Sequence, residues 1–343
     1  MSAGPPVRTA VFVVLLAGSL VQATFTDGFL SYVSRQYGAQ ASSQLARKDL
    51  GVNGSYGGNV FSFPIRILRN PVILVHGLNA DAGALIPVRN FLTKRGYGFN
   101  EIYATSYGPN GRAIGANDAL NCTYVKQLRT LIQAVNSYTG KSTINVGAAL
   151  TSKVATFLSL SGANRGALLC DQQPTAPACN LVNGLSKNSA FIKDINSKQG
   201  YEGQRRYFLR DSIDDTVGFN QSGVQWSTFA GSQINVTTNG FNHVDSLFNT
   251  LWTQWDLIAH NQASQFAIDK DARAESELTG RNCSGSAVGS SQTNPWANAP
   301  WWRGDDTPQG GEYDTQKKVF KFVDGYQYAH GQLGKNWFQP KSG

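Results

Sequence analysis

The feature that most constrains this chain is a short apolar run, Val72-Ile73-Leu74-Val75, between Pro71 and the pair His76-Gly77. Four branched or long apolar residues in a row, bounded in this way, predict a strand that is buried on both faces. The residues that follow, 81–95, have the apolar spacing of a helix that ends at Gly96. A fully buried strand followed by a helix is typical of a parallel sheet.

The alternation of strand and helix continues to about residue 260. Strands are predicted at 72–75, 102–105, 142–146, 154–160, 206–209 and 233–236. Helices are predicted at 26–37, 81–95, 118–138, 186–197 and 244–258. Residues 39–62 are polar and glycine-rich, which indicates a surface segment. The pattern predicts an α/β fold, a mainly parallel sheet with helices on both faces.

One connection in this pattern is too short. The strands at 142–146 and 154–160 are separated by only seven residues, 147–153. Neighbouring parallel strands need a crossover of about a dozen or more residues, normally a helix. We therefore predict that the chain lacks a crossover helix that its sheet requires.

The N-terminal residues predict that the protein is exported from the cell. Arg8 precedes the apolar run 11–16, and Val21-Gln22-Ala23 supplies small residues suited to signal peptidase. The run is too short to span a bilayer, and no later stretch approaches that length, so we expect no transmembrane anchor. The predicted units are a signal peptide (1–23), a core domain (24–263) and a loosely ordered extension (264–343), in a secreted, extracellular protein.

Sequons and cysteines agree with that location. Five Asn-X-Ser/Thr sequons are candidate glycosylation sites: Asn53, Asn121, Asn220, Asn235 and Asn282. Four cysteines allow three pairings. Cys170 and Cys179 bracket a proline-containing loop and are the natural local pair, which leaves Cys122 with Cys283.

The formal charge of +8 is spread along the chain, without a basic run longer than two residues. A general affinity for anionic surfaces and a solvated basic surface both fit this distribution. The chain has no nucleic-acid signature, no metal-ligand spacing and no phosphate loop. We therefore expect no nucleic-acid partner, no metal and no cofactor. The sequence makes no prediction of the oligomeric state.

Several short motifs occur in an order that resembles the class 2 lipase family of nematode secreted proteins, which has the α/β-hydrolase fold. The resemblance covers roughly residues 25–260. It rests on the motifs at 70–77, 160–166, 181–185, 194–197, 214–218 and 242–243. It implies a carboxylic-ester hydrolase of lipid catabolism, with a lipid or small ester as substrate and a Ser-Asp-His triad in that chain order.

The resemblance also assigns roles to residues. The acid is expected just after the strand at 206–209, where Asp214 is the first choice, Asp215 the second and Asp211 the third. His243, in a loop before the last core helix, is the expected general base. In the oxyanion-hole turn that follows the first core strand, the Leu78 N–H is the expected donor, and His76 shapes the turn.

The expected nucleophile is missing. The fold requires Gly-X-Ser-X-Gly at a sharp turn after the strand at 142–146, but residues 147–151 read Gly-Ala-Ala-Leu-Thr. Ser142 lies at the wrong end of its strand. Ser161 belongs to a family motif that does not carry the nucleophile. The missing serine and the missing crossover are therefore predicted to be one lost segment.

Two accounts of this loss fit the sequence. The chain is either a mis-spliced or mis-predicted product of an active lipase gene, or an isoform that has lost catalysis. The competing functional class is a catalytically inactive hydrolase-fold protein that binds a lipid or a partner. A third interpretation is a hydrolase of the same fold that acts on a different acyl substrate.

Overall fold

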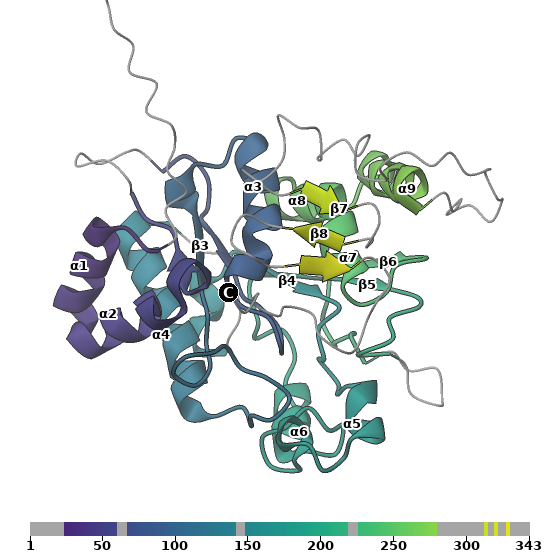
Figure 1. Ribbon diagram of the computed structural model, residues 1–343, viewed down its shortest axis with the longest axis horizontal. Coiled ribbons are helices and arrows are strands. Elements are labelled where there is room, and N and C mark those ends of the chain that lie inside the picture. Colours follow the sequence, from purple (N-terminus) through teal and green to yellow (C-terminus); the bar gives the residue numbers. More distant parts are fainter. Residues whose placement is uncertain are drawn as a thin grey trace, which may run out of the picture.

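The computed structural model describes residues 24–59, 67–141, 148–218 and 226–279, together with three short strands farther along (Figure 1). Those strands, β7 (Glu312–Asp314), β8 (Val319–Lys321) and β9 (Gln327–Ala329), form an antiparallel sheet. The predicted signal peptide and the predicted strand at 142–146 lie outside the described residues. Of the helices that are described, none is both long and apolar enough to cross a bilayer.

Two three-stranded sheets carry the core. In the first, β3 (Ile102–Thr105) pairs in parallel with β2 (Val72–Leu74) and antiparallel with β1 (Ser55–Tyr56). In the second, β4 (Thr156–Leu160), β5 (Arg205–Asp211) and β6 (Ile234–Thr238) are all parallel. The predicted parallel strand pairing is thus present in both sheets.

Helices cover both faces of the sheets. Successive residues of a strand point to opposite faces. Ile73 and Tyr103 pack towards α1 (Asp27–Tyr37) and α4 (Cys122–Thr139), whereas Val72 and Ile102 pack towards α3 (Ile86–Lys94) and α8 (Leu251–Ala259). Figure 1 shows α1, α2 and α4 grouped at one end of the molecule and α8 and α9 at the other. The helices that form these two layers are α1 (Asp27–Tyr37), α2 (Ala39–Ala46), α4 (Cys122–Thr139), α3 (Ile86–Lys94), α8 (Leu251–Ala259) and α9 (Gln265–Thr279).

Side-chain caps set several helix starts later than the apolar pattern predicted. The helix predicted from residue 118 begins at Cys122, because Asn121 Oδ1 accepts the N–H groups of Thr123 and Tyr124 at 2.9 and 3.1 Å. The helix predicted at 186–197 is α6 (Ala190–Asn196), which Ser189 caps in the same way. Periodicity reports the buried face of a helix, whereas the cap decides where the helix begins.

Two other predicted helices are interrupted. The segment 81–95 starts with a 3₁₀ turn, Gly83–Leu85, before α3. The segment 244–258 is two helices, α7 (Asp245–Asn249) and α8, which are separated at Thr250. The Thr250 hydroxyl donates to the Ser246 carbonyl at 2.6 Å, and the backbone then restarts as a new helix. A short helix without a predicted counterpart, α5 (Leu168–Gln172), follows β4.

The predicted surface segment at 39–62 is only partly exposed in its described part, which contains α2 and the buried strand β1. Arg47 explains why a glycine-rich stretch is ordered here. Its guanidinium is buried and donates to Asp49 and to the carbonyl oxygens of Ser106, Pro109 and Arg112. The segment is therefore tied to the 106–112 loop by hydrogen bonds that hydrophobic periodicity does not reveal.

The predicted core boundary at residue 263 lies between two helices that pack together, α8 and α9. Helix α9 begins two residues later, and its Ile268 packs on the cluster formed by β5, β6 and α8. Asp271, which is 2% exposed, accepts the N–H groups of Trp252 and Thr253 at 3.0 and 2.9 Å. A side chain of the predicted extension thus caps the first turn of a core helix.

The structure bears on the predicted cysteine pairs and sequons. Cys170 and Cys179 form the expected disulfide, whereas Cys283, Asn220 and Asn282 lie outside the described residues. Asn121 and Asn235 are exposed. The burial of Asn53 argues against the prediction that it is a glycosylation site. Its residue is only 8% exposed, and its side-chain amide packs directly against Gly83.

We predict that Asp271→Ala lowers the free energy of unfolding by about 1–3 kcal/mol, since it leaves buried N–H donors of α8 without an acceptor. Urea denaturation followed by circular dichroism measures this change. Asp269→Ala is the matched control, because Asp269 is exposed on the same helix. Equal destabilisation by the two substitutions would show that Asp271 does not act as a cap.

Candidate active site

His243 and Asp214 meet at the carboxyl edge of the second sheet. Asp214 follows β5 and His243 follows β6, and the carboxyl ends of neighbouring parallel strands share one edge. His243 Nδ1 lies 2.9 Å from Asp214 Oδ2. The Asp214 side chain is only 3% exposed, whereas the imidazole is 28% exposed. The pair therefore has a buried acid and a base that solvent can reach.

Asp214 is held as a carboxylate. Its Oδ1 accepts the N–H groups of Thr216 and Val217 at 3.0 and 2.9 Å. Burial raises the pKa of Asp214, but the hydrogen bond and charge of His243, with the two backbone donors, outweigh burial and hold the pKa below its usual value. An ionised Asp214 fixes the proton of His243 on Nδ1, which leaves Nε2 as the basic nitrogen.

The two alternative acids make other contacts. Asp211 is buried, and its carboxylate accepts the Thr238 hydroxyl at 2.8 Å and the Ile213 N–H at 2.9 Å. Burial raises the pKa of Asp211. Asp215 is exposed and accepts the backbone N–H of His243 at 3.3 Å. Of the three candidates, Asp214 is the one that contacts the imidazole.

Two serines support the His243 backbone. Ser246 Oγ donates to the His243 carbonyl at 2.8 Å and lies 3.1 Å from Ser161 Oγ. Ser161 follows β4 with φ of 43°, a left-handed conformation that is uncommon for serine, and is 3% exposed. Its hydroxyl is thus turned to Ser246 rather than to the imidazole. Sequence patterns did not reveal the contact with Ser246.

The turn after β2 is built around a neutral His76. Its Nδ1 lies 2.8 Å from the Gly77 carbonyl, which can only accept, and its Nε2 lies 3.0 Å from the Tyr107 N–H, which can only donate. The rings of His76 and Tyr107 stack, with their centroids 4.3 Å apart. Burial lowers the pKa of His76 to about 4, so the imidazole is uncharged at neutral pH. His76 therefore braces the turn, as its sequence context predicted, but Tyr107 was not predicted as its partner.

The next residues fix the backbone that presents Leu78. Asn79 has φ of 60°, its N–H donates to the Ile114 carbonyl at 2.9 Å, and its side chain accepts the Ala116 N–H at 3.1 Å. Within the described ranges, no protein acceptor is assigned to the Leu78 N–H. The role of the Leu78 N–H as an oxyanion donor stays a prediction.

The nucleophile was expected at residues 147–151, of which Gly147 lies outside the described part of the chain. The described chain resumes with a 3₁₀ segment, Ala148–Lys153, that leads into β4. Across the described ranges, no cluster of three or more His, Cys, Asp or Glu side chains is arranged to hold a metal ion.

Comparisons with known proteins identify related sequences and structures. The family model described as "Lipase (class 2)" matches residues 69–149 and, separately, residues 142–256. A comparison with curated proteins gives no match. The crystal structure of the mature lipase BlEst2 of Bacillus licheniformis is 14% identical, with 59% of this chain and 96% of that chain covered and a TM-score of 0.42. An α/β-hydrolase-like protein of unknown function from Agrobacterium tumefaciens is 13% identical, with 67% and 96% covered and a TM-score of 0.33.

We predict that His76 makes the protein less stable in acid. Because its pKa falls from 6.5 in the unfolded chain to about 4 in the native state, only the unfolded chain takes up this proton between those values. The free energy of unfolding should fall by on the order of 3 kcal/mol between pH 7 and pH 4 from this group. Urea denaturation across that pH range should show a flatter profile for His76→Gln. Parallel profiles for the parent and His76→Gln would contradict the assignment.

Proposed function

Because the chain belongs to the class 2 lipase family, we propose that its site is built for serine-dependent hydrolysis of lipid esters and that the chain as written lacks the serine. The α/β-hydrolase fold and a lipase- or esterase-like hydrolase at family level follow from the membership itself. One observation carries the assignment of the site: the buried Asp214 carboxylate lies 2.9 Å from the imidazole of a partly exposed His243.

In the complete site, the chemistry would use these groups in sequence. A serine hydroxyl attacks the ester carbonyl while His243 Nε2 takes its proton, and Asp214 stabilises the resulting imidazolium. The Leu78 N–H donates to the oxyanion of the tetrahedral intermediate. His243 then returns the proton to the departing alcohol, and water hydrolyses the acyl-enzyme by the same route. Each role requires a group at the carboxyl edge of the sheet, where Asp214 and His243 lie.

The lost segment is proposed to comprise the turn that carries the serine, the following helix and its loop. No Gly-X-Ser-X-Gly occurs in the sequence, and only seven residues join two predicted strands. The family match is also divided into two parts that overlap at 142–149, as expected if part of the family sequence is missing at that point. We favour an incomplete gene product, because a functional isoform would have to accommodate a connection too short for neighbouring parallel strands.

Secretion is part of the proposal. Residues 1–23 have the composition of a signal peptide, and the Cys170–Cys179 disulfide is suited to an oxidising compartment.

A catalytically inactive binding protein is the competing proposal. It is favoured by the absence of a serine from the elbow position, together with an acid–histidine pair that is nevertheless assembled. This alternative predicts that the transcript has no longer exon across codons 146 and 147. An exon there that encodes Gly-X-Ser-X-Gly would exclude it.

We predict that the 343-residue chain has no appreciable esterase activity. Loss of the serine alone costs about 10⁶-fold in turnover in a triad enzyme, and this chain also lacks the second oxyanion donor that follows the serine. The test compares the chain with a version in which a family-like elbow and helix are inserted after Val146, on a series of aliphatic p-nitrophenyl esters.

The restored version should hydrolyse these esters, and His243→Ala should abolish its activity. His260→Ala is the matched control, because His260 pairs with Asp256 away from the site and should leave turnover unchanged. Comparable ester turnover in the original and restored chains would refute the position assigned to the nucleophile.

A further inference from the structure

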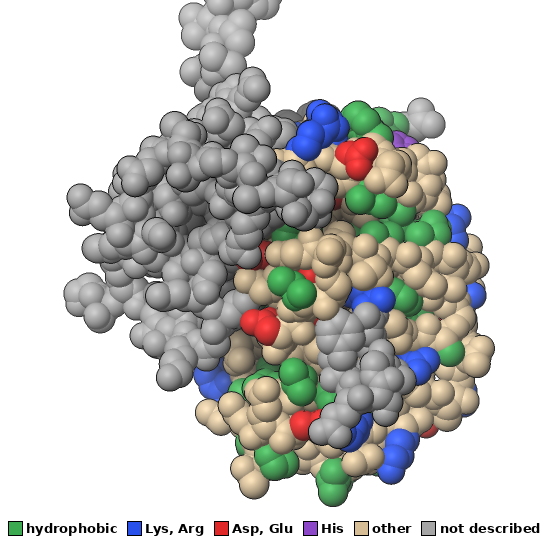
Figure 2. Space-filling model, turned by 90° about the vertical axis from the view of Figure 1, so that its right-hand side faces the viewer, with side chains coloured by type: hydrophobic (Ala, Val, Ile, Leu, Met, Phe, Trp, Pro, Cys, Tyr) green, Lys and Arg blue, Asp and Glu red, His purple; other side chains and the backbone are tan. Residues whose placement is uncertain are grey.

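Asp211 is a buried carboxyl group that the proposed chemistry does not use. It ends β5, is only 1% exposed, and is paired in register with Thr238 at the end of β6. Figure 2 views the side of the molecule where β5, β6 and α9 lie in Figure 1, and it shows charged side chains dispersed among polar and hydrophobic ones. Asp211 does not contribute to such a surface. Burial of a carboxylate is costly unless donors satisfy it, so its contacts indicate its role.

The donors to Asp211 come from two loops. Its Oδ1 accepts the Ile213 N–H at 2.9 Å, at the start of the acid loop, residues 212–218, which carries Asp214. Its Oδ2 accepts the Thr238 hydroxyl at 2.8 Å, where β6 ends and the histidine loop, residues 239–244, begins. One side chain therefore joins the beginnings of the two loops.

The histidine loop turns further donors toward the same carboxyl group. Burial raises the pKa of Asp211, but the backbone N–H groups of Phe241 and Gly240 oppose that shift together with the Ile213 N–H and the Thr238 hydroxyl. Gly240 has φ of 109°, a conformation that favours glycine, so the chain can turn at this point. Asp211 thus serves as an acceptor for the turn that leads to the histidine.

Beyond Asp211 the acid and histidine loops have few contacts with each other apart from the acid–histidine pair. The Ser212 hydroxyl donates to the Asn239 side chain, and Asp215 accepts the His243 N–H at 3.3 Å, but both of these contacts are exposed to solvent. Exposed hydrogen bonds compete with water and contribute little to holding two loops together. The contacts of Asp211 are buried, so they are the ones that can fix the spacing of the loops.

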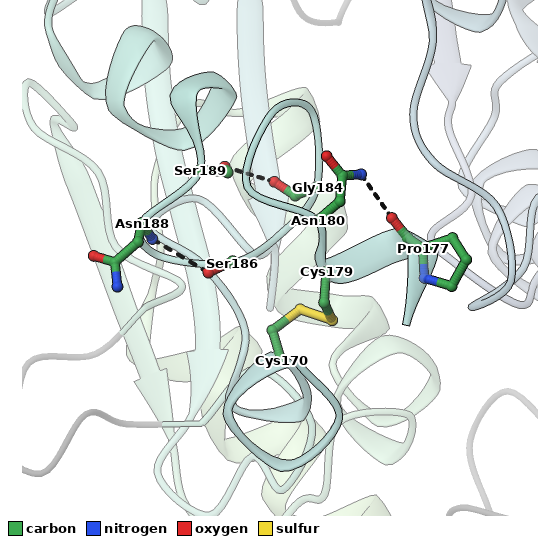
Figure 3. The surroundings of a disulfide bond; sticks show 8 residues. All are labelled: Cys170, Pro177, Cys179, Asn180, Gly184, Ser186, Asn188 and Ser189. Carbon is green, nitrogen blue, oxygen red and sulfur yellow. Dashed lines mark hydrogen bonds between the residues drawn. A yellow bond between two sulfur atoms is a disulfide. The ribbon is translucent and has the colours of Figure 1, made fainter. Parts of the chain in front are cut away.

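The far end of the acid loop is held independently. The first two N–H groups of α5 donate to the carbonyl oxygens of Val217 and Thr216 at 2.9 and 3.3 Å. Figure 3 shows the Cys170–Cys179 disulfide that fixes α5. The acid loop is therefore anchored at its end by α5 and at its beginning by Asp211.

We propose that Asp211 is a positioning residue, which holds the acid loop against the histidine loop so that Asp214 reaches His243 Nδ1. This inference rests on the proposed function, since it explains how the acid–histidine pair of that site is set. Asp211 acts through the other two residues and contacts neither the substrate nor the reacting atoms.

Loss of this carboxyl group should separate the acid–histidine pair. Asp211→Ala leaves buried N–H donors of both loops without an acceptor, so water must enter or the loops must move apart. The contact of 2.9 Å between His243 and Asp214 then lengthens, and a hydrogen bond weakens steeply when its geometry is lost. An imidazole that no longer donates from Nδ1 to Asp214 reverts to the Nε2–H tautomer, which free histidine prefers.

The test reads the tautomer of His243 in the 343-residue chain by nitrogen-15 NMR of the imidazole, at about pH 9, where an ordinary imidazole is neutral. His243→Gln identifies the signals. The parent should carry the proton on Nδ1, and Asp214→Asn should move it to Nε2, because the tautomer depends on the carboxylate. Asp211→Ala should move the larger part of the population to Nε2 as well.

A conservative variant separates the bridge from its charge. Asp211→Asn keeps an oxygen for the Ile213 N–H, and its amide can donate to the Thr238 oxygen while the Thr238 hydroxyl donates to the Arg210 carbonyl, 3.2 Å away. This variant should therefore retain the Nδ1–H tautomer. A shift to Nε2 as complete as that of Asp211→Ala would show that charge sets the tautomer, and would overturn the proposal.

Glu202→Ala is the matched control for loss of a buried carboxyl group. Glu202 is 7% exposed and precedes β5, at the opposite edge of the same sheet, so this variant should keep the tautomer of the parent. If circular dichroism shows that Asp211→Ala is unfolded, Thr238→Val removes one donor to Asp211 and should give a mixture of both tautomers.

Three results would each overturn the proposal: a parent without the Nδ1 proton, an unchanged tautomer in folded Asp211→Ala or in Thr238→Val, or the same shift in Glu202→Ala. None of these measurements requires ester turnover. A restored enzyme without esterase activity would refute the proposed function and leave this result intact.

Discussion

The parallel pairing of β4, β5 and β6 is the constraint on which the rest of the site depends. Parallel strands point their carboxyl ends to the same edge, so the loops after β5 and β6 must run side by side. Asp214 and His243 are far apart in the chain but need only short loops to meet there. Parallel pairing also requires a crossover between neighbouring strands, and on this ground we propose that the short connection at 147–153 marks the lost segment.

The site is rigid because its loops are hydrogen-bonded to each other as well as to the sheet. Arg47 ties the α2–β1 segment to the 106–112 loop, and Tyr107 of that loop holds His76 in a single tautomer. The hydroxyl groups of Ser246 and Ser161 fix the backbone beside His243. These hydrogen bonds fix the backbone around the acid–histidine pair without any contribution from a nucleophile.

Sequence reasoning succeeded where one local property decides the structure. The run at 72–75 is apolar enough to be a buried strand in any context. Asp214 and His243 each lie in a motif that can be recognised from the adjacent residues alone. It failed where the structure depends on a contact with another residue that the local pattern does not reveal. Thr250 splits a helix that is continuous by periodicity, and Asn53 looks like an open sequon until Gly83 packs against it. No sequence motif marks Tyr107 or Ser246, because their roles consist of contacts that form only when the chain folds.

The cap on α8 has a consequence for how this protein can be shortened, by evolution or by a protease. Asp271 lies beyond the residue at which the family-like core was expected to end, yet it holds the first turn of the helix that packs under β2 and β3. A cut near residue 263 would release a segment that the core cannot replace. Helix α9 is thus a structural part of the hydrolase domain, and a shortened chain should retain it to keep α8 in place.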